Sequence, residues 1–202
     1  VYDGTGGASY VTDIGIQNGR IAELGDLSDA PAHKRIDVTG LAVSPGFIDI
    51  HTHSDAVLLA DGRADSQLMQ GVTSELFGQC GFSFAPVADA ERMAKWMIGR
   101  LPGVDVTWRT FGEYLDTLEQ KSLGLNVMGL VGHGAVRGAV LGDEVRAPSE
   151  AELQHMEALV AESLDGGAWG MSTGLEYWPG IGATASELTR LCSIVADCGG
   201  LH

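Results

Sequence analysis

The chain has 202 residues, of which 45% are hydrophobic and 19% are charged, and its formal net charge is −15. This composition supports a packed core and argues against disorder, while the strong negative charge argues against nucleic acid and anionic membranes as partners. Three cysteines without a dense spacing pattern, and a sequence without an apolar run of transmembrane length, predict a cytoplasmic protein that has no disulfide framework.

The first 44 residues predict a small β layer, because their apolar residues show no helical period. Asn18 and Gly19 lie between two apolar stretches, which is a strong signal for a hairpin with a two-residue turn. Residues 35–43 predict a further strand that is interrupted at Gly40. We therefore treat residues 1–44 as one region of short strands and turns.

From Pro45 onward, predicted strands alternate with predicted helices. The strands are expected over 47–51, 72–77, 125–131 and 168–173. Helices are expected over 61–70, 90–100 and 111–121, and capping boxes at Ser149 and Thr184 open two more. A fifth strand would begin at Leu201. This succession favours a parallel sheet covered by helices, either a closed barrel or an open doubly wound sheet.

The segment from Pro45 to His53 carries the clearest chemical signal, with the sequence Pro-Gly-Phe-Ile-Asp-Ile-His-Thr-His. Alternate side chains of a strand share a face, so Asp49, His51 and His53 are expected on one side. Two imidazoles at a strand end can bind a metal ion, and the carboxylate could hold a ring N–H. The alternative is a pair of loop histidines bonded to water or to the main chain.

Cys80 follows the second predicted strand of this series. Neighbouring strands are about 4.8 Å apart, so its thiolate is expected beside His51 and His53, as a zinc ligand. Gly78 and Gly81 would let the backbone turn sharply there. The alternative is that Cys80 is a buried structural cysteine.

Two further residues are candidates for contact with a substrate. His133 lies between two glycines after the third strand, where it could face a pocket or order a loop. Tyr177 lies past the fourth strand and could touch a substrate or pack a loop. Cys192 and Cys198 fall in the last predicted helix, and we expect both to pack in the core.

Four motifs, in order along the chain, resemble those of the amidohydrolase superfamily. Residues 45–55 are similar to its opening metal motif. Residues 70–83, 130–137 and 170–177 are similar to the D-aminoacylase (N-acyl-D-amino-acid deacylase) branch, although this chain has Gln79 where that branch usually has Asn. The resemblance spans nearly the whole chain.

The resemblance implies a metal-dependent (β/α)8 TIM-like barrel flanked by a β-sandwich. Residues 1–44 would be the N-terminal part of the sandwich, and residues 45–202 the first four to five βα units of the barrel. A complete barrel needs roughly 250 residues, and the chain starts at Val1 rather than Met and stops just after a pair of glycines. We therefore expect an internal segment of a longer protein.

The resemblance also implies hydrolysis of the amide bond of N-acyl-D-amino acids to a carboxylate and a free D-amino acid. One or two zinc ions would be held by His51, His53 and Cys80, with the cysteine able to bridge two metal positions. The family's other histidine ligands and its general-base aspartate would lie beyond residue 202, so we assign no catalytic residue. The isolated chain is expected to be inactive, and zinc-dependent deacylase turnover by it would contradict this.

Two other functions remain open. A cyclic amidase of the hydantoinase or dihydroorotase type bridges two metals with a carboxylated lysine after the fourth strand. The lysines of this chain are Lys34, Lys95 and Lys121, and none of them lies at the end of the fourth predicted strand, which argues against this alternative. A non-catalytic protein on an amidohydrolase scaffold is the second alternative. The joint presence of two histidines and a cysteine argues against it, and metal analysis would separate the two cases.

Overall fold

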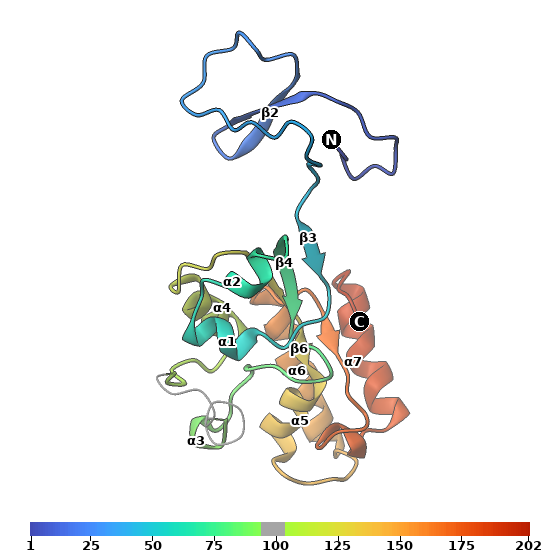
Figure 1. The fold of residues 1–202 in the computed structure, drawn as a ribbon. Helices are drawn as coiled ribbons and strands as arrows, with labels where there is room; N and C mark the ends of the chain where they lie inside the picture. Colours follow the sequence, from blue (N-terminus) through green and yellow to red (C-terminus); the bar gives the residue numbers. More distant parts are fainter. Residues whose placement is uncertain (94–103) are drawn as a thin grey trace. The chain divides into compact units, whose positions relative to one another are not determined.

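The computed structural model describes residues 1–93 and 104–202. The chain forms two compact units, Val1–Gly46 and Phe47–His202, and Figure 1 colours them along the sequence from blue to red. In the described residues, no helix is both long and apolar enough to cross a membrane.

The first unit contains the predicted hairpin. Strand β1 (Asp13–Gln17) pairs antiparallel with β2 (Arg20–Gly25). Asn18 and Gly19 connect them, with φ values of 52° and 72°. Positive φ at both turn positions matches the twist of the flanking strands, so the Asn-Gly signal is confirmed.

The prediction of a strand over residues 35–43 is wrong, because the structure describes all of these residues and has no strand there. The amide of Thr39 donates to the Asp37 carboxylate over 2.9 Å, and Gly40 has a φ of 79°. These local features turn the chain in the middle of the apolar stretch. Within residues 1–46, all of which the structure describes, the sheet therefore has two strands.

Every strand pair described in the second unit is parallel, as predicted. One sheet has the order β3 (Phe47–Asp49), β4 (Val72–Phe77) and β5 (Asn126–Gly129), and β6 (Val131–Gly132) pairs with β7 (Met171–Ser172). Gly170 forms an isolated parallel bridge with Leu201, where the fifth strand was expected. Figure 1 shows β3 and β4 side by side.

The strand predicted over 125–131 is divided at Leu130 because the chain changes neighbours there. The amide of Leu130 donates to Phe77, at the end of β4, over 3.0 Å. The next amide, that of Val131, donates to Gly170 over 2.9 Å. Leu130 thus joins the β3-β4-β5 sheet to the β6-β7 pair.

The described helices of the second unit follow the strands in sequence. They are α1 (Asp55–Ala60), α2 (Asp65–Leu68), α3 (Ala90–Met93), α4 (Phe111–Glu119), α5 (His133–Leu141), α6 (Glu150–Asp165) and α7 (Ala185–Asp197), with a short 3-10 helix η2 (Gly180–Gly182). The predictions for α4, α6 and α7 are confirmed. The helix expected over 61–70 is shorter, α1 and α5 were not predicted, and the end of the helix expected over 90–100 lies outside the described residues.

Helix α6 shows how local sequence sets a helix in place. The Ser149 side chain accepts from the amide of Glu152, and the Glu152 carboxylate accepts from the amide of Ser149, which completes the predicted capping box. Met156 and Val160, which are four residues apart on one face of the helix, are fully buried. The helix therefore packs one face into the core and leaves the other exposed.

The core combines aromatic and aliphatic side chains from several helices and strands. Tyr114 from α4 packs against Phe77, Phe84, Trp108 and Phe111. Cys192 is partly buried against this core, as predicted. Cys198 directly follows the end of α7 at Asp197 and is exposed, so its predicted core position is wrong.

Candidate metal centre

The two histidines of the opening motif lie just beyond β3 rather than within it. The strand ends at Asp49, so the predicted alternation of side chains does not extend to His51 and His53. The amide of Thr52, between them, donates to Leu76 of β4 over 3.2 Å, which keeps this segment beside the neighbouring strand. The Asp49 carboxylate accepts from the main-chain amide of His51 over 3.1 Å, where a ring contact had been expected.

Cys80 lies on a tight turn directly after β4. Gly78, Cys80 and Gly81 have φ values of 79°, 57° and 75°, so the turn uses left-handed backbone conformations, as the two glycines predicted. The hydroxyl of Ser172 in β7 accepts from the amide of Gly81 over 2.9 Å and donates to the carbonyl of Gly78. One buried hydroxyl therefore holds both ends of the turn.

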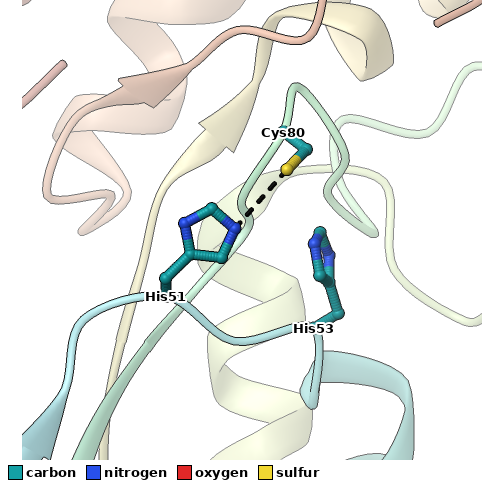
Figure 2. A group of neighbouring side chains, drawn as sticks. All are labelled: His51, His53 and Cys80. Carbon is teal, nitrogen blue, oxygen red and sulfur yellow. Dashed lines mark hydrogen bonds between the residues drawn. The ribbon is translucent and has the colours of Figure 1, made fainter.

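The structure brings the three predicted ligands together. One ligand atom each from His51, His53 and Cys80 lies within 4.8 Å of the others, and Cys80 Sγ is 3.5 Å from His51 Nε2. Figure 2 shows the histidines reaching this place from the segment after β3 and Cys80 from the turn after β4.

The donor set and its spacing fit zinc. Zinc–nitrogen bonds of about 2.05 Å and zinc–sulfur bonds of about 2.3 Å place the two ligand atoms about 3.6 Å apart at the tetrahedral angle. The separation of Cys80 Sγ and His51 Nε2 is 3.5 Å. Two imidazoles and a thiolate are also ligand types that zinc prefers.

The immediate surroundings favour a neutral imidazole at His53. Partial burial and the neighbouring His51 lower the pKa of His53, which favours the uncharged form that binds metals. Two buried carboxyl groups lie close by. Burial raises the pKa of Asp55 to about 7, with a smaller contribution from Glu75. Burial likewise raises the pKa of Glu75, although the hydrogen bond from Ser54 opposes this.

Asp55 and Glu75 were not among the residues predicted from the sequence. The main chain of Gly78 hydrogen-bonds to the Asp55 carboxylate, so this residue supports the turn that carries Cys80. Both had a weak signal: Asp55 lies two residues after His53, and Glu75 lies in the middle of a predicted strand. An acidic residue rarely becomes buried without a partner.

A model of the Amidohydrolase family matches residues 34–200. The chain belongs to the amidohydrolase family. This confirms the resemblance that the sequence motifs indicated.

This amidohydrolase is similar to several deacylases. It is 40% identical over 200 residues to the D-aminoacylase of Alcaligenes xylosoxydans xylosoxydans. This match covers 99% of this chain and 41% of that protein. It is 40% identical over 202 residues to an N-acyl-D-glutamate deacylase of the same organism, with 100% of this chain and 41% of that protein covered. The chain thus spans about 41% of the length of these curated relatives.

Solved structures of deacylases share the fold. A D-aminoacylase described as having a binuclear metal centre matches this amidohydrolase with a TM-score of 0.87 and 38% identity, covering 98% of this chain and 42% of that one. The N-acyl-D-glutamate deacylase of Bordetella bronchiseptica, complexed with zinc and a phosphonate inhibitor, matches with a TM-score of 0.89 and 36% identity. That match covers 99% of this chain and 42% of the other.

His133 of this amidohydrolase is fully buried at the start of α5. Its Nε2 lies 2.7 Å from Glu187 of α7, and Arg137 donates to the same carboxylate over 2.6 Å and 2.7 Å. The amide of Gly134 donates to Gly81 over 2.9 Å, which links this helix start to the Cys80 turn. The geometry favours a role of His133 in ordering the loop, and its contact with a substrate stays a prediction.

Tyr177 of this amidohydrolase lies at the end of a short series of aromatic rings. Its ring centroid is 5.4 Å from that of Phe82, and Phe82 is 6.4 Å from the ring of His53. The residue is 46% exposed. Tyr177 is therefore accessible beside the candidate metal centre, and its contact with a substrate stays a prediction.

Replacing Gly78 with alanine is expected to lower the free energy of unfolding by roughly 2–5 kcal/mol, because strained φ and a steric clash act together. A Cβ atom there would lie 2.0 Å from the carbonyl oxygen of Leu130. Urea unfolding of the alanine variant measures this cost. Gly199→Ala is the matched control, since Gly199 has a φ of 68° and a Cβ atom added to it would meet no other atom within 4 Å. Equal losses in the two variants would contradict the clash.

Proposed function

We propose that this chain is part of a zinc-dependent enzyme that hydrolyses the amide bond of N-acyl-D-amino acids to a carboxylate and a free D-amino acid. The observation that carries the proposal is the convergence of His51, His53 and Cys80, whose ligand atoms lie within 4.8 Å of one another. The similarity to D-aminoacylase and to N-acyl-D-glutamate deacylase supports the substrate class. The free cysteines of the chain support a cytoplasmic location.

We also propose the finer architecture. The second unit would supply the first four to five βα units of a (β/α)8 barrel, and residues 1–44 would be part of a β-sandwich. The parallel order β3-β4-β5, followed by β6-β7 and the bridge to Leu201, supports the barrel. The ligands lie just after the carboxyl ends of β3 and β4, where barrel enzymes carry their active residues.

The residues of the chain have distinct roles in this proposal. His51, His53 and Cys80 would hold one or two zinc ions, and a bound zinc would act as a Lewis acid and activate water for amide hydrolysis. The lowered pKa of His53 keeps its ring available as a ligand at neutral pH. Tyr177 and Phe82 would offer an aromatic surface to the substrate. The general base is expected beyond residue 202.

The test uses the full-length protein, purified with its metal content determined. We expect bound zinc, turnover of N-acetyl-D-amino acids, and much slower turnover of the matching L-substrates. Hydantoin and dihydroorotate serve as controls for the cyclic amidase alternative. Turnover of the cyclic substrates alone would favour that alternative, and a protein with neither zinc nor turnover would favour a non-catalytic scaffold.

A further inference from the structure

We propose that the side-chain amide of Gln79 is a positioning group, which ties together the two segments that carry the metal ligands and thereby sets the affinity for zinc. This inference rests on the proposed function, since it concerns the same metal centre. Gln79 is not itself a ligand. It acts through the main chain next to His51 and through its own neighbour in the chain, Cys80.

The contacts of Gln79 connect the two segments directly. Its Nε2 donates to the carbonyl of Ile50 over 2.9 Å and to that of Leu76 over 3.3 Å. Ile50 immediately precedes His51, and Gln79 immediately precedes Cys80. The side-chain amide of Gln79 therefore joins two points of the main chain, one directly before His51 and the other directly before Cys80.

This tie begins where the regular pairing of the strands stops. The parallel register of β3 and β4 ends at Asp49 and Glu75. Past that point, the Thr52 amide and the Gln79 side chain both donate to the carbonyl of Leu76. The side chain of Gln79 thus connects the two segments beyond the last backbone pair of β3 and β4.

The position of Gln79 makes its hydrogen bonds effective. The residue is 8% exposed, so the bonds to Ile50 and Leu76 meet little competition from water. Removing the donor would leave the carbonyl of Ile50 without this partner and free the segment before His51 to move. The separation of Cys80 Sγ and His51 Nε2 is already near the value that zinc needs, so such movement can only weaken the fit.

The experiment measures metal affinity in the full-length protein. Gln79→Met keeps the size of the side chain and removes the donor. Because loss of a group that orients metal ligands costs roughly 10- to 100-fold in affinity, we expect the zinc dissociation constant, determined by chelator competition, to rise by that factor. In the cobalt-substituted protein, the thiolate-to-cobalt absorption should weaken or shift.

Two controls separate positioning from general destabilisation. Gln70→Met also removes a side-chain amide that donates to a carbonyl, that of Ser66 over 2.9 Å, but it lies on the exposed surface. Leu191→Ala opens the core at α7, where Leu191 is fully buried. We expect both to keep the zinc dissociation constant within about threefold of the native value, since neither residue orients a ligand. If Gln79→Met does not fold, Gln79→Ser, which leaves room for water to meet the carbonyls, is measured with the same expectation.

The outcomes are distinguishable. A native zinc affinity and a native cobalt spectrum in the Gln79 variant would overturn the inference and leave the proposed function intact. An equal loss of affinity in Leu191→Ala would also overturn it, because general destabilisation would then explain both. A native protein that binds no zinc would overturn the proposed function and this inference together.

Discussion

Replacing Cys80 with alanine is expected to abolish stoichiometric zinc binding and to lower kcat/KM for N-acetyl-D-amino acids by roughly 10³-fold. A metal Lewis acid supplies several kcal/mol of transition-state stabilisation, and each 1.36 kcal/mol is a factor of about ten in rate. Cys80 provides the sulfur of the candidate centre, 3.5 Å from His51 Nε2. Zinc analysis and steady-state kinetics on the full-length protein measure both effects.

The matched control for this variant is Cys198→Ala. Cys198 is an exposed thiol at the end of α7 and does not belong to the His51, His53 and Cys80 group. Its loss should leave zinc content and kinetics unchanged. Full zinc occupancy and native turnover in Cys80→Ala would refute the assignment of Cys80 as a ligand.

Glu187→Gln is expected to lower the free energy of unfolding at pH 7 by about 3–5 kcal/mol, because it leaves a buried charge without its partner. The side chains of Glu187 and Arg137 are both fully buried, and the carboxylate also meets the ring of His133. The amide that replaces the carboxylate keeps the shape but removes the negative charge opposite the guanidinium. Denaturant unfolding of the variant and the native protein measures the difference.

The pH dependence of this difference follows from the pKa of Glu187. Burial raises that pKa, but the hydrogen bonds from His133 and Arg137 and their charges outweigh burial and lower it below its usual 4.5. A lowered native-state pKa contributes stability that is present above the unfolded-state pKa and is lost as the pH falls through the native value. The gap between native protein and variant should therefore be full at pH 7 and shrink in acid.

Glu150→Gln is the control for the buried pair, since Glu150 pairs with Arg190 on the surface of α6 and α7 over 2.9 Å. Exposed ion pairs contribute about 0–1 kcal/mol. If Glu187→Gln lowers the free energy of unfolding no more than Glu150→Gln does, burial does not increase the contribution of the Glu187–Arg137 pair to stability.

Much of the second unit could be predicted because its signals are local. Strand β4 occupies Val72–Phe77, the range predicted for it, and α6 begins at the capping box of Ser149. The convergence of the three candidate ligands was also predicted, but only one of the two structural reasons given for it is present. Neighbouring parallel strands do deliver His51 and Cys80 to one place, whereas the alternation along β3 fails because that strand ends at Asp49.

The buried charges could not be predicted, because their partners are distant in sequence. The contacts of Glu187 with His133 and Arg137 span 54 and 50 residues. Glu187 also has the spacing of a capping box with Thr184, a local pattern that predicts a carboxylate at the helix start. Thr184 does accept from the amide of Glu187, but the carboxylate turns inward to the buried Arg137 and to the ring of His133.

The backbone contacts around the Cys80 turn restrict how this protein can diverge. A methyl group at Gly174 would lie 1.9 Å from the carbonyl oxygen of Cys80, and one at Gly180 would lie 2.4 Å from that of Gly174. Main-chain atoms cannot rotate aside as a flexible side chain can, so any other amino acid at these two positions would force the backbone to shift. Selection for new substrates would act more readily through accessible neighbours such as Tyr177, which is 46% exposed.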